Sequence, residues 1–464
     1  MNDFPKNDYI LFKSDKAVYI NDTGNTASNI VVNMQFPKTP MNWQPEQSRL
    51  NFDFYAYRAG AALPDYRYID KDVNSLFSNI RVYIGNKRVV NSENVAHYLH
   101  MKTDITSNPA DLYGKDISLL GGSPDITDTL PIIEYELPDP YAPGTYESTI
   151  SNYNFINNAK NNNVFFGLNV ASAIVSRRVS MTLHNILGSG LQGNKNIATH
   201  LLGGAVRLEL DCNNARDIAF ADDNANRITQ YRIGNLTYKA SVIYLTTQMV
   251  RELYPNNEMT FTARNFYNET IHIPAGTSDI VADIKTFQFK YARAIYFFFT
   301  NPASKLSYTK MYLSQRIRAN CHSYYLTKNN VPYPNKPITG VGEQYEELLK
   351  CSKTKSTLLT IETFNFNANS ELTATDDLIT ADDIDYNNIK RFVGAINLEK
   401  FGNGTTNLTT SDDLKLHIEL RTQSFNAFPI TTSVHQTAEE LDLMVFVEFD
   451  EHYRFQNGDF FVDK

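Results

Sequence analysis

One stretch of the sequence, residues 188–193 (GSGLQG), matches the glycine pattern of dinucleotide-binding loops letter for letter. In such a site the glycines lie between a strand and a helix of a βαβ unit, and an acidic residue follows about 20 residues later. Here the following residues, NKNIATHLLGGAV, are interrupted by glycines, and no alternation of strand and helix patterns surrounds them. We therefore interpret residues 188–193 as a loop and expect no cofactor.

Two histidines, His97 and His100, have the H-x-x-H spacing of a zinc site on a predicted helix. A protein zinc site needs three or four ligands, and catalysis also needs a general base such as the Glu of HExxH. The stretch around the two histidines has neither that Glu nor a nearby Cys. We therefore expect no metal here and predict that both histidines face solvent or the helix cap.

An acidic cluster lies in the segment ATDDLITADDIDY, which contains Asp376, Asp377, Asp382, Asp383 and Asp385. A calcium-binding EF-hand loop needs regularly alternating ligands, a central Gly and a closing Glu. The segment has none of these features. This favours a solvated loop, with weak cation binding as the alternative.

Cys321 and His322 are the one adjacent pair that could form a nucleophilic thiolate and imidazole. They fall on a predicted strand, where neighbouring side chains point to opposite faces. The sequence also has no P-loop, GxSxG or CxxC motif. We predict no catalytic, cofactor-binding or metal-ligating residue and expect that the protein is not an enzyme.

The composition indicates a chain of strands and turns. Its 464 residues include 28 Tyr, 28 Phe and a single Trp, Trp43, while Asn, Asp and Thr crowd the spaces between short apolar runs. Aromatic and β-branched residues favour strands, and Asn, Asp, Gly and Pro favour turns. We therefore predict an all-β protein, and the length suits two domains.

Charge and cysteine usage limit the possible partners and compartments. The net charge of −8, without a basic terminal arm, disfavours a nucleic-acid groove or an anionic membrane surface. The three widely spaced cysteines, Cys212, Cys321 and Cys351, fit reduced thiols in an intracellular folding compartment. The N-terminal residues lack a signal-peptide pattern, and no run approaches the about 20 apolar residues of a membrane helix. We expect no signal peptide and no transmembrane segment.

One supersecondary pattern occurs twice. Residues 80–90 predict a hairpin, because a Gly-Asn turn interrupts an apolar alternation, and a helix is expected from Ser92. Residues 325–331 (YLTKNNV) repeat the YIGNKRV that begins at Tyr83, 242 positions earlier, and an acidic helix is expected at 342–350. Two copies of one pattern suggest that the two halves of the chain have the same fold.

Two further landmarks follow in the same order in both halves. The alternating strand VRLEL at 206–210 corresponds to LHIEL at 416–420. The predicted closing strand at 236–245 corresponds to the one at 441–449. Strict alternation of this kind is typical of half-buried strands.

The remaining strands are expected at residues 17–20, 30–34, 49–57, 132–137, 164–170, 178–183, 259–263, 270–273, 285–289, 294–300, 322–326 and 391–397. The polar stretch 106–163 is too long for an ordinary connection and predicts an elaborated surface loop. Together these patterns predict two tandem eight-stranded antiparallel jelly-roll sandwiches with short helices and long loops. We place the boundary in the polar segment 247–256, which gives an N-terminal jelly roll at 1–248 and a C-terminal one at 249–464.

Three segments resemble the double jelly-roll major capsid proteins of the lineage that includes Polinton-like viruses, adintoviruses, virophages and, more distantly, adenovirus hexon. The first, SLFSNIRVYIGNKRVVNSENVAHYLHMKTDI, is similar to a family pattern of strand, Asn-containing turn and Tyr-bearing helix. Residues 185–220 resemble a family segment that ends in a charged alternating strand, and the strand at 231–244 follows as in relatives. Residues 323–338 are similar to the hairpin of the second jelly roll. The chain departs from the family with CNN from Cys212, where relatives commonly carry Arg-Asn.

This resemblance implies a viral major capsid protein whose three copies form a pseudo-hexagonal homotrimeric capsomer that tiles an icosahedral shell around a dsDNA genome. The implied partners are the chain itself, neighbouring capsomers, and penton and minor or cement proteins, with no sequence-specific nucleic acid. The implied location is the virion, after folding in the host cell interior. We predict that the loops at 106–163 and 364–388 make inter-subunit contacts, so that deleting the tip of the first loop abolishes trimers.

Two other classes of protein stay open. A trimeric β-sandwich spike that binds a receptor or glycan predicts exposed Trp and Tyr clusters and soluble trimers that never tile. A β-sandwich hydrolase predicts a pocket with convergent carboxylates and measurable turnover. The single Trp and the lack of a catalytic motif disfavour the hydrolase.

Overall fold

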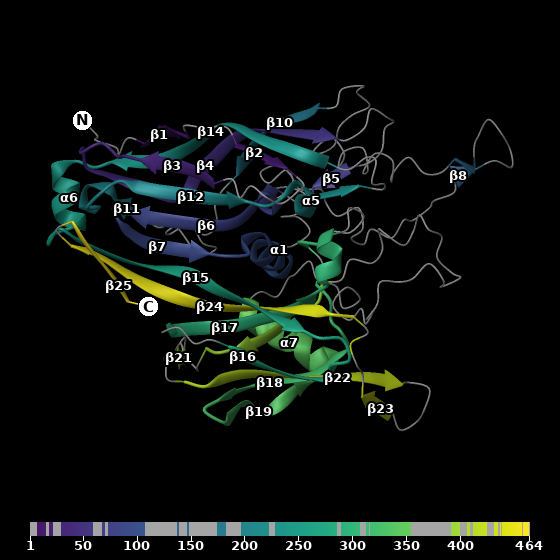
Figure 1. Cartoon of the computed structure of the whole chain (residues 1–464). Coiled ribbons are helices and arrows are strands. Elements are labelled where there is room, and N and C mark those ends of the chain that lie inside the picture. Colours follow the sequence, from purple (N-terminus) through teal and green to yellow (C-terminus); the bar gives the residue numbers. More distant parts are fainter. Residues whose placement is uncertain are drawn as a thin grey trace.

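The computed structural model describes the elements that form two stacked β-sandwiches (Figure 1). The described residues are 7–14, 18–21, 29–58, 67–69, 73–106, 137–138, 146–147, 174–181, 196–221, 228–284, 289–306, 312–314, 316–353, 391–399, 406–408, 412–424, 431–434, 437, 439–456 and 458–463.

The first sandwich has two antiparallel sheets, which we call sheet 1a and sheet 1b. Sheet 1a has the order β1 (Asn7–Lys13), β14 (Ile228–Tyr244), β4 (Met41–Arg58) and β10 (Ile174–Met181), with β2 (Val18–Asn21) and β11 (Ile197–Ala198) added at its sides. Sheet 1b has the order β3 (Asn29–Met34), β12 (Val206–Cys212), β6 (Phe77–Ile84) and β7 (Lys87–Ser92).

The second sandwich repeats this arrangement in sheets 2a and 2b. Sheet 2a has the order β15 (Glu258–Ile273), β24 (Leu441–Gln456), β17 (Phe289–Thr300) and β20 (Gly394–Asn397), with β21 (Thr406–Leu408) and β25 (Asp459–Asp463) at its sides. Sheet 2b has the order β16 (Asp279–Ile284), β22 (Leu414–Ser424), β18 (Cys321–Lys328) and β19 (Val331–Thr339), with β23 (Thr431–Val434) paired to β22.

Short helices and two small ribbons complete the described elements. The α-helices are α1 (Val95–Thr106), α5 (Ala215–Ile218), α6 (Thr247–Leu253) and α7 (Gly340–Ser352), and the 3₁₀-helices are η1 (Val73–Leu76), η3 (Thr199–Leu201) and η5 (Pro302–Leu306). The ribbons pair β5 (Arg67–Ile69) with β13 (Ala219–Ala221) and β8 (Leu137–Pro138) with β9 (Tyr146–Glu147). None of the helices described in these ranges has the length and apolar character needed to span a membrane.

The two sandwiches have the same topology. When the eight main strands of each half are numbered in chain order, both halves have one sheet with the order 1-8-3-6 and one with the order 2-7-4-5. This is the connectivity of two tandem eight-stranded jelly rolls, and it confirms the predicted fold class.

The three repeated landmarks occupy equivalent positions. The hairpin β6–β7 followed by α1 corresponds to the hairpin β18–β19 followed by α7, β12 corresponds to β22, and β14 corresponds to β24. Gly85 has a φ of 57°, and Asn329 and Asn330 have φ values of 51° and 65° at the corresponding turn. Both hairpins therefore use residues that tolerate left-handed backbone. The helix predicted from Ser92 begins instead at Val95, because Ser92 belongs to β7.

Two details of the strand prediction are wrong. Residues 259–263 and 270–273 are not separate strands, because β15 runs through both. The intervening asparagines are typical of turns, but here Asn265 donates to the Tyr453 hydroxyl at 3.1 Å and Asn268 donates to the backbone of β24 at 3.1 Å. Strand β16 is not among the predicted strands, although its burial alternates along all six of its residues.

Strand β17, in the middle of sheet 2a, is buried on both of its faces. In β17 the run Ala294–Phe299 is at most 2% exposed throughout. Phe297 packs against Tyr324 of sheet 2b inside the second sandwich, whereas Phe298 lies beside His97 of α1 in the first sandwich. This explains why the sequence AIYFFF has no polar alternation, since neither face meets water.

Several predicted features lie outside the described residues. They are the glycine-rich stretch 188–193, the acidic segment 376–385, the strand at 164–170, nearly all of the strands at 132–137 and 285–289, the loop 364–388 and most of the loop 106–163. They stay predictions.

Candidate functional site

The most elaborate polar site of the described chain lies between the two sandwiches, along helix α1 (Figure 1). Ten of the twelve residues of α1 are buried, and five of them are polar or can ionise: His97, Tyr98, His100, Lys102 and Asp104. Polar groups in such a position need partners, because an unpaired buried charge costs several kcal/mol. All five contact residues of the second sandwich.

The prediction that His97 and His100 face solvent or the helix cap is wrong. Their exposed fractions are 3% and 0%, because α1 has the first sandwich on one side and the second on the other. The ring of His97 meets the ring of Tyr312 edge-on at 5.1 Å between centroids, and Nδ1 of His100 lies 3.3 Å from the Leu313 carbonyl oxygen. Burial, together with the nearby charges of His100 and Arg316, lowers the pKa of His97 to about 3. His97 is therefore neutral at neutral pH.

Tyr98 joins helix α1 to strands β15 and β24. Its ring stacks on Phe266 with 3.7 Å between centroids, and its hydroxyl donates to Glu448 Oε1 at 2.7 Å. Burial first, and then the charge of Glu448, raise the pKa of Tyr98 well above its usual range. The hydroxyl thus stays protonated and acts as a donor to a buried carboxylate, which is a strong type of hydrogen bond.

Lys102 provides the positive charge for the same carboxylate. Its Nζ lies 3.0 Å from Glu448 Oε1 and donates to the Tyr296 hydroxyl at 3.4 Å. Burial would raise the pKa of Glu448, but Lys102 and Arg264 outweigh it, so the pKa lies below its usual value. Glu448 is therefore ionised although it is 1% exposed.

The charges continue across the outer face of sheet 2a as an alternating row, which we call the interdomain ion network. Its members, in order, are Lys102, Glu448, Arg264, Asp450, Arg293, Glu399 and Lys353. The last member, Lys353, caps the C-terminus of α7 with a left-handed φ of 56°. The network thus connects the equivalent helices of the two sandwiches.

A second buried ion cluster fixes the C-terminal end of α1. Asp104 is 1% exposed, pairs with Arg316 and lies 3.4 Å from Nη1 of Arg391. Both arginines belong to the second sandwich and are at most 2% exposed. A carboxylate held by two guanidinium groups has its charge compensated in the low-dielectric interior.

The C-terminal hairpin β24–β25 makes a separate contact with the first sandwich. The Tyr453 hydroxyl donates to the Val89 carbonyl oxygen and Lys87 Nζ donates to the Phe460 carbonyl oxygen, each at 3.0 Å. At Gly203 a Cβ would lie 2.0 Å from the carbonyl oxygen of Gly458. Only glycine permits this close approach of the two backbones.

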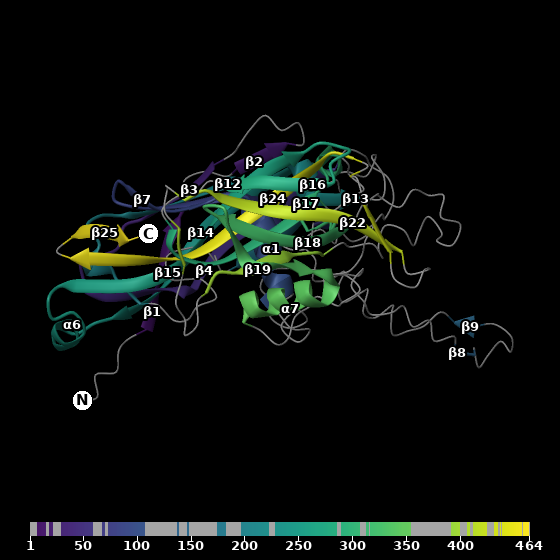
Figure 2. The same ribbon diagram turned by 90° about the horizontal axis from the view of Figure 1, so that it is seen from below.

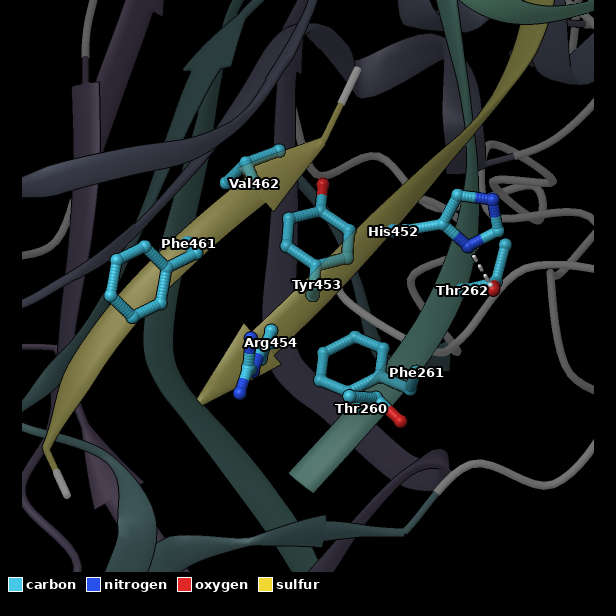
Figure 3. Close-up of a pocket in the computed structure, with 8 residues that line it drawn as sticks. All are labelled: Thr260, Phe261, Thr262, His452, Tyr453, Arg454, Phe461 and Val462. Atoms are coloured by element: carbon cyan, nitrogen blue, oxygen red, sulfur yellow. Dashed lines mark hydrogen bonds between the residues drawn. The ribbon is translucent and has the colours of Figure 1, made fainter. Parts of the chain in front are cut away.

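A shallow pocket lies on the same hairpin, between β15, β24 and β25 (Figure 3). Its volume is about 570 Å³, and within it Thr262 Oγ1 and His452 Nδ1 lie 2.7 Å apart. Its lining residues are Thr260, Phe261, Thr262, His452, Tyr453, Arg454, Phe461 and Val462. This set includes no carboxylate or cysteine, so the pocket does not have the acid–base pair that the hydrolase alternative requires.

The cysteines do not form a nucleophilic site. All three are free, and Cys212 and Cys321 are buried. Burial raises the pKa of Cys321 to about 12, and His322 follows it on strand β18 with its side chain on the opposite, half-exposed face. Within the described residues no group of three or more His, Cys, Asp or Glu side chains is arranged to hold a metal ion.

The sequence does not identify the partners of α1. Glu448 and Asp450 interrupt the apolar strand MVFVEFD, and such buried carboxylates are the one signal that could have pointed to a basic partner. Lys102, the partner of Glu448 on α1, is separated from it by more than 300 positions. Only the arrangement of the two sandwiches brings these groups together.

The comparisons with known proteins concern the fold. No protein-family model matches the sequence, and no curated protein matches it. The Sputnik virophage structure is similar, with a TM-score of 0.59 and 11% sequence identity over 97% of this chain and 89% of that chain. VP54 of PBCV-1, fitted into a reconstruction of Sputnik, has a TM-score of 0.55 and 9% identity over 100% of this chain and 98% of that chain. The mavirus major capsid protein has a TM-score of 0.53 and 12% identity over 98% of this chain and 90% of that chain. The chain therefore has the fold of viral double jelly-roll capsid proteins over its whole length.

Proposed function

We propose that the chain is a viral major capsid protein whose three copies form a pseudo-hexagonal capsomer, and that these capsomers tile an icosahedral shell around a dsDNA genome. The observation that carries this proposal is the repeated 1-8-3-6 and 2-7-4-5 topology, with two sandwiches held together by buried charge pairs. Two equivalent sandwiches per chain supply six similar units to a trimer, which is the number that a hexagonal outline needs.

The buried contacts of α1 support an architectural role. A subunit of a closed shell must keep its two domains in a fixed relative orientation. A buried ion pair resists their separation, because breaking it leaves an uncompensated buried charge. Tyr98, Lys102 and Asp104 supply such restraints at two points along α1. We accordingly expect no catalytic turnover.

The same proposal includes the partners, the location and the domain boundary. The partners are further copies of the chain, then penton and minor or cement proteins, and the location is the virion after folding inside the host cell. The boundary after residue 248 lies within α6, between the last strand of the first sandwich and the first strand of the second.

Sedimentation of the purified chain tests the proposal. We expect a species of three times the 52.8 kDa chain mass that associates further as the salt or protein concentration changes. A chain that stays monomeric at every concentration would contradict it. Soluble trimers that bind glycans and never associate would favour the spike alternative.

A further inference from the structure

Helices α1 and α7 are equivalent in the two jelly rolls but differ in burial. Each follows the fifth main strand of its sandwich, yet ten of the twelve residues of α1 are buried and only two of the thirteen residues of α7, Gln344 and Leu348. Helix α1 lies between the sandwiches (Figure 1), and α7 lies at the lower edge of the ribbon when the molecule is seen from below (Figure 2). Within the part of the chain that the structure describes, the outer face of α7 therefore lacks the cover that α1 has.

The outer faces of sheets 1a and 2a differ in the opposite sense: the face in the second sandwich is covered, and the equivalent face in the first sandwich is exposed. The outer face of β15 and β24 in sheet 2a is covered by α1, through the contacts of Tyr98 with Phe266 and Glu448. The equivalent strands in sheet 1a are β1 and β14. On the corresponding face Tyr9 is 55% exposed and Leu11 is 59% exposed.

We propose that the outer face of α7 docks on the β1–β14 face of sheet 1a in a second copy of the chain. This contact repeats between chains the contact that α1 makes with sheet 2a within one chain. It rests on the proposed capsid function, because it names the surface through which the trimer forms.

Charge complementarity supports this choice of partner. The exposed side of α7 carries Glu343, Glu346 and Lys350, and the Glu346 side chain is 67% exposed. Lys350 Nζ lies 3.1 Å from Glu346 and 3.6 Å from Glu347, so three carboxylates face one lysine and the helix surface keeps an excess of negative charge. The β1–β14 face carries Lys13 and Lys239, and Lys239 Nζ lies 3.9 Å from the ring centre of Tyr9. An acidic helix thus meets a basic sheet that has exposed apolar side chains at its edge, which is a composition suited to an interface.

The proposed contact is of a type that can close into a ring. The two surfaces lie on different sandwiches, so the contact is heterologous, and a heterologous contact closes into a ring when its rotation is an integral fraction of a turn. In the proposed trimer the same helix-on-sheet contact recurs at each of the six sandwich boundaries, which requires a rotation of about one sixth of a turn at each boundary. Half of these boundaries are within chains and half are between chains.

A charge exchange tests the proposal. Lys239→Glu and Glu346→Lys should each raise the trimer dissociation constant about tenfold or more, because each places like charges in the contact. The double variant should return the constant to near that of the wild type. Asp283→Lys is the matched control: this carboxylate on β16 is 79% exposed and lies on neither surface, so its reversal should leave the trimer unchanged.

A zero-length carbodiimide cross-link gives a second readout that needs no variant. In trimers mixed from ¹⁵N-labelled and unlabelled chains, we expect cross-linked peptides that join Lys13 or Lys239 of one chain to Glu343 or Glu346 of another. If both single variants trimerise like the wild type, or if these cross-links occur only within chains, the proposed surface is wrong while the capsid function stands. A wild-type chain that is always monomeric would overturn both.

Discussion

Tyr98 of the first sandwich and Glu448 of the second share a hydrogen bond of 2.7 Å at a place where both side chains are at most 5% exposed. The bond joins residues 350 positions apart, and the stacking of Tyr98 on Phe266 fixes its direction. Because Glu448 also pairs with Lys102, one carboxylate connects α1 with sheet 2a. Glu448 is therefore one of the points at which the two jelly rolls are joined.

Replacing Tyr98 by Phe should distinguish the contribution of the hydrogen bond to stability from the contribution of ring packing. The ring can still stack on Phe266, but Glu448 loses one of its donors, so we expect a loss of about 1–3 kcal/mol in the free energy of unfolding. Denaturant unfolding monitored by circular dichroism measures this. Tyr98→Ala should lose clearly more, because it removes the buried ring as well. If Phe is neutral at this position, the hydrogen bond does not contribute to stability.

Replacing Lys102 by Met should destabilise the chain by about 3–5 kcal/mol at pH 7, because it leaves Glu448 as a less compensated buried charge. Burial then outweighs the remaining opposite charge, and the pKa of Glu448 rises above its unfolded value. A carboxyl with a raised folded-state pKa gains stability as the pH falls, so the variant should recover part of its lost stability when the pH is lowered from 7.

The single Trp makes the Lys102→Met experiment specific to the coupling between halves. Trp43 is buried in the first sandwich, so its fluorescence follows that sandwich, while circular dichroism follows both. We expect the two transitions to coincide in the wild type and to separate in the variant. Lys328→Met removes an ion pair of similar length, 3.1 Å, from a lysine that is 36% exposed, and it should change stability by no more than about 1 kcal/mol. Equal effects of both variants would contradict the buried network.

His97 should make the chain sensitive to acid. Its folded-state pKa of about 3 lies below the ordinary histidine pKa of 6.5, so protons bind the unfolded chain more tightly. Stability from this group is present above pH 6.5 and is lost as the pH falls toward 3, by up to about 1.4 kcal/mol per pH unit. His97→Phe keeps a ring beside Tyr312 and removes the titration, so its stability should fall less steeply over this range. Parallel profiles for the two chains would mean that His97 does not titrate as proposed.

Gly203 should not tolerate a side chain. In Gly203→Ala the new Cβ would meet the backbone carbonyl of Gly458 at 2.0 Å, so we expect the C-terminal hairpin to separate from the first sandwich and the melting temperature to fall by several degrees. Gly342→Ala is the matched control on α7, where a Cβ meets nothing within 4 Å. That variant should be neutral or slightly more stable, since Ala favours a helix over Gly. Hydrogen exchange at β25 locates the effect, and an unchanged exchange rate in Gly203→Ala would show that the contact is not tight.

The sequence allows the fold to be predicted where one face of a strand is buried. Strands such as β12 and β22 alternate strictly, and the repeated turn residues at Gly85 and Asn329 mark equivalent hairpins. The prediction is wrong where polar residues pair across long distances. Asn265 is typical of a turn by type, but it lies within β15 because its amide group bonds to the neighbouring strand.

The site between the sandwiches could not be predicted for the same reason. His97 and His100 have the spacing of metal ligands, and histidine is a residue type that is often found at the surface. They are buried only because the second sandwich packs against α1. Local sequence determines on which side of α1 each histidine lies. It does not determine that the outward side of α1 faces another jelly roll.

Electron microscopy of the purified wild-type chain tests the central claim most directly. The account predicts trimeric particles with a hexagonal outline, built from six sandwich-sized units, that assemble into sheets or closed shells as the concentration rises. Dispersed monomers with two sandwich-sized lobes and no lateral association would contradict it.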